Sequence, residues 1–389
     1  MGKTLNEIAQ ELKASSKKSQ LIYAFNGTGK TRLSREFKEL ISPKSQEGDE
    51  HIGDLEYKKI LYYSSFTEDL FYWDNDLEND AQIKLKIHPN SFTNWVFMEQ
   101  GLELKVTENF QRYTNARLTP NFNQQYEIKD GNGRRVVIPA FSEVTFSYET
   151  GDDTPKNHIK ISKGEESNFI WSIFSTLIEE VIQIRNQVEH RQTNKFDSIE
   201  YIFIDDPVSS LDENHLIELA VNLAKLIKSS DFNNNKIKFI ITTHSSIFYN
   251  ILYNELSLTE GFLLEKYEDE SFSLNKKQGD SNSAFSYHIH LKQTLETAIS
   301  NNMIEKYHFT LLRNLYEKTA SFLGYKNWSD LLPDNDSRQS YYSRIMNFSS
   351  HSSLANETSI YLTDAEKNIV GYLLNDLTNR YNFFKYEEQ

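Results

Sequence analysis

Cysteine is missing from the 389-residue sequence, which excludes disulfide bonds and metal sites built on thiolates. Long apolar runs are missing too, since none approaches the roughly 20 residues that span a bilayer. The first residues, MGKTLNEIAQ, lack the apolar core of a signal peptide. We therefore expect a cytoplasmic protein with no membrane segment.

Positive charge is scarce in the first part of the chain. The formal net charge is −14, and residues 276–389 hold 12 basic and 13 acidic residues, which leaves −13 for residues 1–275. The first part should repel a bare phosphate backbone, so a contact with nucleic acid is expected to be local and C-terminal. The 22 Tyr and 25 Phe residues indicate a folded core.

The chain divides into two regions of different character. Apolar strand-like runs, QLIYAF, KKILYYSS, NHIKIS, IEYIFIDD and KIKFIITTH, alternate with helical patterns before residue 275. This alternation predicts an α/β domain with a mostly parallel sheet over residues 1–275. Within it, residues 75–150 show scattered aromatics and are interpreted as an irregular insertion with one hairpin at DGNGRR. Residues 276–389 are predicted to form a mainly α-helical domain.

A glycine-rich turn follows the first apolar run, in LIYAFNGTGKTRLS. It fits the pattern G-x-x-x-x-G-K-[ST] except that Ala24 stands in the first position. Glycines let successive N–H groups face one anion, and a helix that begins near the lysine adds its positive end. The lysine can reach the β- and γ-phosphates and the threonine can bind Mg²⁺. The predicted nucleotide-binding residues are Asn26, Gly27, Thr28, Gly29, Lys30 and Thr31.

Two carboxylates end a later apolar run, in YIFIDD. Asp205 is placed to hold the Mg²⁺ shell, and Asp206 to orient or activate the attacking water. His244, in ITTHS, follows the next strand. It is either a third member of this site or a histidine satisfied in the core.

These segments resemble the ABC-type ATPases, including their SMC-like and DNA-repair relatives. In ISKGEES, Ser162, Gly164 and Glu165 take the places of the signature's serine, second glycine and glutamine. SSLD, which ends at Asp212, resembles the loop that follows the strand with the Mg²⁺-binding aspartate in these ATPases. His244 resembles their switch histidine. The resemblance implies a homodimer or higher homo-oligomer in which the signature of each copy faces the glycine-rich phosphate-binding loop of the other copy. Asp206 replaces the usual glutamate, which implies slow hydrolysis, and Lys163 replaces the first signature glycine.

The C-terminal helices carry polar residues at helical spacing. Arg313 and Glu317 lie four apart in LLRNLYEKTASFLGY, and Arg344 and His351 lie seven apart in RIMNFSSH. A carboxylate and an imidazole can move the two protons of RNA cleavage without metal, and an arginine can stabilise the phosphorane. A surface ion pair between Arg313 and Glu317 is the alternative interpretation.

The whole chain resembles the bacterial anticodon nucleases of the PrrC family, from MGKTLNEIAQEL through TEDLFYWDNDL and IDDPVSSLDENHLIELAVNLAKLIKSS to YHFTLLRNLYEKTASFLGY. The resemblance implies a catalytic triad of Arg313, Glu317 and His351. It also implies tRNA recognition by Asp280, Ser281 and Asn282. The implied activity is cleavage of a tRNA, typically lysine tRNA, in its anticodon loop, leaving a 2′,3′-cyclic phosphate and a 5′-OH.

The same resemblance implies regulation and partners. Mg²⁺ with ATP or GTP, and dTTP as a further nucleotide, would control the enzyme, and no metal would serve the nuclease step. A type I restriction-modification complex would silence it, and a phage-derived activator would release it in antiviral defence. Arg344 with His351 also resembles the HEPN ribonuclease pattern, so Arg344 is assigned a supporting contact in an HEPN-like domain.

One alternative function stays open. An ABC-type ATPase of DNA repair or sensing could use its C-terminal helices only to bind a partner. RNA cleavage that survives EDTA would distinguish the nuclease from such a protein.

Overall fold

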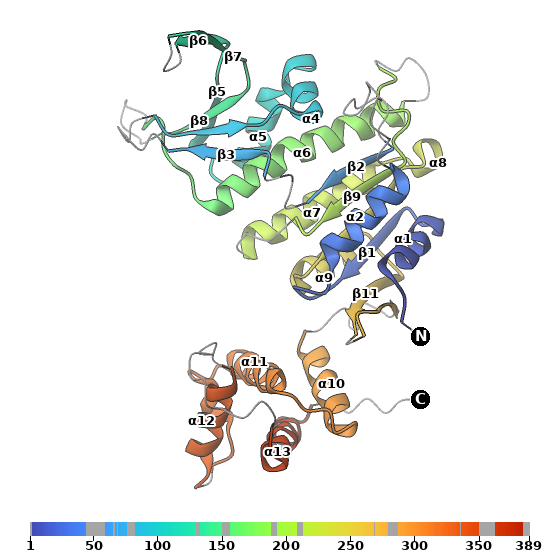
Figure 1. Ribbon diagram of the computed structural model, residues 1–389, viewed down its shortest axis with the longest axis vertical. Coiled ribbons are helices and arrows are strands. Elements are labelled where there is room, and N and C mark those ends of the chain that lie inside the picture. Colours follow the sequence, from blue (N-terminus) through green and yellow to red (C-terminus); the bar gives the residue numbers. More distant parts are fainter. Residues whose placement is uncertain are drawn as a thin grey trace. The chain divides into compact units, whose positions relative to one another are not determined.

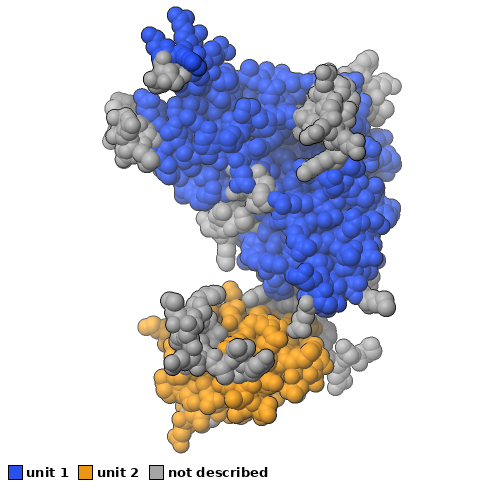
Figure 2. All heavy atoms as spheres, in the orientation of Figure 1, with its two compact units in different colours: residues 1–284 blue, residues 285–389 orange. Residues whose placement is uncertain are grey.

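The structure, a computed structural model, describes residues 2–43, 59–64, 67, 69–75, 82–129, 133–149, 156–187, 193–207, 213–267, 269–278, 287–334, 336–349 and 362–383. The chain forms two units, residues 1–284 and 285–389 (Figure 2). The boundary predicted after residue 275 falls inside the last strand of the first unit.

A six-stranded sheet organises the first unit. Its order is β12-β11-β1-β10-β9-β2, and every pairing is parallel except that of β11 with β12. The predicted α/β class with a mostly parallel sheet is therefore confirmed. The strands are β1 (Ser19–Tyr23), β2 (Ile60–Tyr63), β9 (Tyr201–Asp205), β10 (Lys238–Thr243), β11 (Glu260–Lys266) and β12 (Phe272–Gln278).

Helices pack on this sheet through apolar stripes. α1 (Leu5–Ala14) and α2 (Lys30–Ile41) share one core cluster with side chains of β1, β9 and β10. Phe37 of α2 lies 5.1 Å from Tyr201 and 5.6 Å from Phe203, measured between ring centroids. α7 (Glu213–Ser229) packs against α9 (Ser246–Glu255), which contacts β1 and β10, and the short α8 (Phe232–Asn235) precedes β10.

A second sheet occupies much of the stretch predicted to be irregular. β3 (Phe71–Asp74), β4 (Lys84–Ile87), β8 (Glu143–Tyr148) and β5 (Leu118–Phe122) pair antiparallel in that order. Helical segments α4 (Ser91–Asn94), the π-helix Trp95–Glu99 and α5 (Glu103–Tyr113) lie between these strands in the sequence. The prediction of an irregular insertion is therefore wrong. Strands this short show no clear alternation of apolar and polar residues, so the sequence did not reveal them. The hairpin at DGNGRR is confirmed by β6 (Tyr126–Lys129) and β7 (Arg135–Ile138).

The long helix α6 (Lys163–Asn186) lies between the two sheets (Figure 1). Its Phe169 packs 5.2 Å from Phe146 of β8, and its Trp171 packs 5.1 Å from Tyr63 of β2. Contacts with both sheets explain why its side chains are buried almost all round. The strand predicted at NHIKIS is wrong: this segment forms no strand before the helix begins, since His158 has φ +54° and the Ile159 N–H donates singly to the Phe146 carbonyl of β8.

The second unit is helical, as predicted. Its elements are α10 (Tyr287–Ser300), α11 (Lys306–Leu323), the 3₁₀ turn Trp328–Leu331, α12 (Arg338–Ser349) and α13 (Asp364–Arg380). α11 contacts the other three helices and supplies Phe309, Leu312 and Tyr316 to their shared core. No helix in the described part of the chain is both long and apolar enough to cross a membrane.

Candidate functional site

The loop between β1 and α2 depends on two glycines. Gly27 has φ +81° and Gly29 has φ +110°, values that L side chains rarely adopt. A Cβ on Gly29 would also lie 3.3 Å from the ring of Phe272. The Thr28 N–H donates to the Phe25 carbonyl at 3.2 Å and closes the turn. The backbone therefore curls directly before the N-terminus of α2, as a phosphate-binding loop requires.

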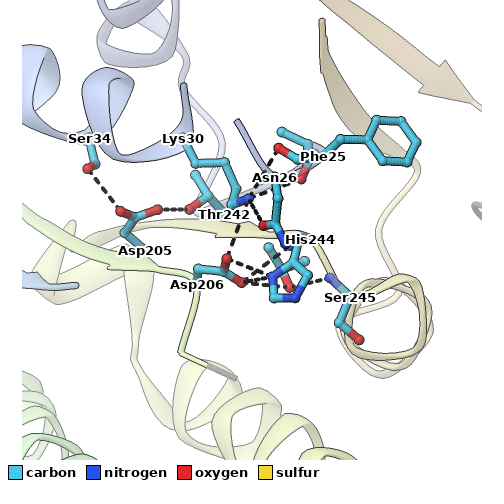
Figure 3. A network of polar contacts seen from close by, with 11 residues as sticks. Phe25, Asn26, Lys30, Ser34, Asp205, Asp206, Thr242, His244 and Ser245 are labelled. Carbon is cyan, nitrogen blue, oxygen red and sulfur yellow. Dashed lines mark hydrogen bonds and ion pairs between the residues drawn. The ribbon is translucent and has the colours of Figure 1, made fainter. Parts of the chain in front are cut away.

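Lys30 connects this loop to the end of β9. Its Nζ donates to the carbonyls of Ala24 and Phe25, both at 3.3 Å, and to Asn26 Oδ1 at 3.2 Å. The same ammonium lies 3.4 Å from Asp206 Oδ2, and the side chain is only 7% exposed (Figure 3). A phosphate bound in the loop would compete for this buried charge.

Asp205 is held by hydroxyl groups at the end of β9. Thr242 Oγ1 donates to its Oδ1 at 2.6 Å, and Ser34 Oγ donates to its Oδ2 at 3.3 Å. Burial raises the pKa of Asp205 and the neighbouring Asp206 adds to this, while hydrogen bonds from Thr242, Thr31 and Ser34 act in the opposite direction. The Thr31 hydroxyl and the Asp205 carboxylate therefore lie together.

Asp206, directly after β9, adopts a left-handed backbone with φ +53°, which is uncommon for a residue other than glycine. Its carboxylate lies 2.7 Å from Nδ1 of His244 and accepts the His244 N–H at 3.3 Å. Burial alone would raise the pKa of Asp206, but the hydrogen bonds and charge of His244 and the charge of Lys30 outweigh burial and lower it. His244 is 30% exposed and lies at this site, so it is not a histidine of the core.

These groups fit a nucleotide with Mg²⁺. Hydroxyl and carboxylate oxygens are the ligands that Mg²⁺ accepts, and Thr31 with Asp205 would supply them. The curled loop and Lys30 would hold the phosphates, whose charge Mg²⁺ would partly neutralise. Asp206 and His244 lie beside Lys30, where they could orient a water.

The signature-like residues stand at the start of α6. Ser162 caps the helix: its Oγ accepts the Glu165 N–H at 3.3 Å, and Glu165 Oε2 accepts the Ser162 N–H at 2.7 Å. Gly164 follows in the first turn. None of the three belongs to the polar network of Figure 3. Their contact with the nucleotide of a second copy stays a prediction.

Arg313 and Glu317 meet on the surface of α11. Arg313 Nε donates to Glu317 Oε1 at 2.7 Å, and the side chains are 29% and 39% exposed. Arg344 lies on α12, partly buried. Hydrogen bonds from Thr363 lower the pKa of Glu366 and the charge of Arg344 adds to this effect, which places Arg344 near the start of α13.

Several predicted site residues lie outside the described residues. These are Asp212, Asp280, Ser281, Asn282 and His351. The structure therefore brings together Arg313 with Glu317, and the nucleotide loop with Asp205, Asp206 and His244.

Ser34 and Thr242, which hold Asp205, are not among the residues predicted from the sequence. The signal for Thr242 was available, because it lies in ITTHS on the predicted neighbouring strand and pairs with Asp205 in the sheet. The signal for Ser34 is its position one turn after Lys30 on α2, which faces the same strand end.

Comparisons with known proteins point to one family. No protein-family model matches the chain. Among solved structures, an Smc head bound to the C-winged helix domain of ScpA has a TM-score of 0.35 at 10% identity, covering 70% of this chain and 93% of that one. An Smc head from Pyrococcus furiosus with an extended coiled coil, bound to the C-terminal domain of ScpA, has a TM-score of 0.28 at 10% identity, covering 48% and 37%. A curated anticodon nuclease of Escherichia coli is 54% identical over 414 aligned residues, which cover all of both chains. At this identity over the full length, the chain belongs to the anticodon nuclease family.

Proposed function

We propose that the protein is a nucleotide-gated endoribonuclease that cleaves a tRNA, with lysine tRNA as the expected substrate, inside the anticodon loop. The observation that carries this proposal is the Arg313–Glu317 contact of 2.7 Å on a partly exposed helix face. It occurs in a chain that matches an anticodon nuclease along its whole length.

The proposed chemistry is transesterification without metal. Of Glu317 and His351, one removes the proton of the ribose 2′-OH and the other protonates the departing 5′-oxygen. Arg313 stabilises the negative charge that develops on the phosphorane, and Arg344 adds a supporting contact in an HEPN-like arrangement. The products are a 2′,3′-cyclic phosphate and a 5′-OH. Anticodon loops suit this site because their bases can leave the stack.

The first unit is proposed to gate the second. Lys30, Thr31 and Asp205 would bind ATP or GTP with Mg²⁺, and dTTP would act as a further regulatory nucleotide. Transesterification needs no energy input, so the nucleotide sets a conformational equilibrium instead. Dimerisation through the first units, slow hydrolysis with Asp206, silencing by a type I restriction-modification complex and release by a phage-derived activator complete the proposal.

End-mapping of tRNA tests this function. Purified wild-type protein is incubated with lysine tRNA in the presence of each nucleotide with Mg²⁺, and EDTA is added at the cleavage step. His351→Ala and Lys30→Ala are the comparison variants. New 5′-OH ends in the anticodon loop, absent with His351→Ala and reduced with Lys30→Ala, are expected. Intact tRNA under every nucleotide, with nucleotide hydrolysis present, would favour an ATPase that only binds a partner.

A further inference from the structure

The side of α11 that faces away from the helical core carries two exposed aromatic side chains and an exposed lysine, with the half-buried Asn314 between them. Tyr307 is 52% exposed and Phe322 is 88% exposed, and Lys318 is exposed between them. Their spacing of eleven and four residues, with Asn314 between, keeps them on one side of the helix. We call this side, formed by Tyr307, Asn314, Lys318 and Phe322, the outer face of α11.

The outer face borders the Arg313–Glu317 pair. Along the helix Tyr307 precedes Arg313 by six residues, or about 9 Å at 1.5 Å per residue. Asn314 precedes Glu317 by three residues, so the two are neighbours on the helix surface, and the pair lies between Tyr307 and Lys318 along the helix axis. A ligand that reaches the pair from solvent therefore adjoins the outer face.

Charge on this helix differs from that of the whole chain. α11 holds Lys306, Arg313 and Lys318 against the single acid Glu317, whereas the full chain has a net charge of −14. α12, which packs against α11, adds Arg338 and Arg344, but Arg338 pairs with Asp330 and Asp334 and Arg344 lies near Glu366. The positive charge that complements a phosphate backbone is therefore that of α11 itself.

Tyr307 is held in a defined position. The centroid of its ring lies 3.9 Å from that of the buried His308, at an angle of 34°. His308 Nδ1 in turn accepts the Glu305 N–H at 2.9 Å and completes the capping box of α11. The tyrosine ring therefore rests on a fixed imidazole while half of its side chain faces solvent, and little order has to be gained when a base stacks on it.

We propose that the outer face of α11 binds the single-stranded RNA loop that the neighbouring pair cleaves. Tyr307 stacks on an unpaired base and Lys318 contacts a phosphate, so that the phosphodiester between them is presented to Arg313 and Glu317. The combination of an aromatic platform with lysine and arginine is typical of single-stranded RNA sites. This inference rests on the proposed function and adds binding residues to it.

Binding of a non-cleavable RNA tests the inference. The probe is a fluorescent anticodon stem–loop of lysine tRNA with 2′-O-methyl groups throughout the loop, titrated with the full-length protein. Stacking contributes about 1–3 kcal/mol per base, so Tyr307→Ala should weaken binding by about 5- to 150-fold. Tyr307→Phe, which keeps the ring, should bind nearly as wild type. Lys318→Gln should reduce the slope of log Kd against log salt concentration by about 0.7, the value for one phosphate of a single strand.

Matched controls come from α13. Tyr372→Ala removes a tyrosine that is 46% exposed, and Lys367→Gln removes a lysine, both outside the outer face. Neither should change binding, and urea unfolding of every variant checks that the second unit is folded. Equal affinities for Tyr307→Ala and Tyr372→Ala, in a wild-type protein that does cleave tRNA, would overturn this inference alone. A wild-type protein that neither binds nor cleaves the RNA would overturn the proposed function as well.

A protein partner would give a different result. If Tyr307→Ala and Phe322→Ala dissociate an oligomer, as measured by light scattering, while RNA affinity stays unchanged, the outer face is an interface between copies of the chain. That outcome also overturns the proposal.

Discussion

Replacement of Arg313 by glutamine should separate stability from activity. The pair that Arg313 forms with Glu317 is an i,i+4 contact whose side chains are 29% and 39% exposed. Exposed pairs of this kind contribute about 0.3–0.5 kcal/mol, and the order of arginine before glutamate is the less favourable one. We therefore expect Arg313→Gln to lower the free energy of unfolding by no more than about 0.5 kcal/mol.

The expected loss of activity is much larger. Removal of one preorganised group that stabilises an oxyanion costs about 10²- to 10³-fold in kcat, or about 2.7–4 kcal/mol. The activation barrier should therefore rise at least about five times more than stability falls. A side chain with a purely structural role cannot produce this ratio.

Arg380→Gln is the matched control. Arg380 forms an i,i+4 pair with Asp376 at 2.9 Å in the same unit, and also donates to the carbonyls of Leu331 and Leu332. We expect this control to lose at least as much stability as Arg313→Gln and to keep its activity. Single-turnover cleavage of lysine tRNA in EDTA gives the change in the activation barrier, and urea unfolding gives the change in the free energy of unfolding. Cleavage by Arg313→Gln at the wild-type rate, or equal losses in both variants, would refute the reasoning.

Three further predictions concern the loop, the buried lysine and a histidine. Gly29→Ala places a side chain at φ +110° against Phe272 and should cost more than about 1 kcal/mol of unfolding free energy, measured in urea; unchanged stability would contradict the strain argument. Lys30→Ala should abolish the thermal stabilisation by ATP with Mg²⁺, which for wild type is about 2.7 kcal/mol at one hundred times Kd; a full shift in the variant would contradict the assignment. Burial lowers the pKa of His308, so as pH falls below about 6.5 the unfolded chain binds a proton that the folded chain excludes, and stability decreases. His308→Gln keeps a cap acceptor and should remove this slope in urea unfolding between pH 8 and pH 5; an unchanged slope would assign the effect elsewhere.

The nucleotide site was predictable because its signals are local. β1, β9 and β10 are buried strands with uninterrupted apolar runs, and the loop glycines and Lys30 lie within a few residues of one another. Such patterns depend on residues that are close in sequence, so they can be recognised in one sequence. The helical second unit was predictable for the same reason, since apolar residues recur at helical spacing along α11.

The second sheet was not predictable in this way. Its strands have four to six residues, and β8 pairs with both β4 and β5, which lie in different parts of the chain. Its core depends on Phe110, Phe146 and Phe169, whose rings lie 5.2–5.8 Å apart although the residues are widely separated in sequence. Contacts between residues so far apart in sequence produce no periodic pattern of apolar residues in a short sequence window.

The position of β1 in the sheet has a consequence for synthesis of the chain. β1 pairs with β10 and β11, and β10 begins 215 positions after β1 ends. At 5–20 residues per second, a ribosome needs roughly 10 to 40 seconds to make the partner of a strand that emerged first. The loop after β1 therefore gains its fixed shape only when β10 is available, yet β10 is still made before residues 285–389. During each round of translation, the nucleotide-binding unit can thus be complete before the helical unit that we propose to be the nuclease exists.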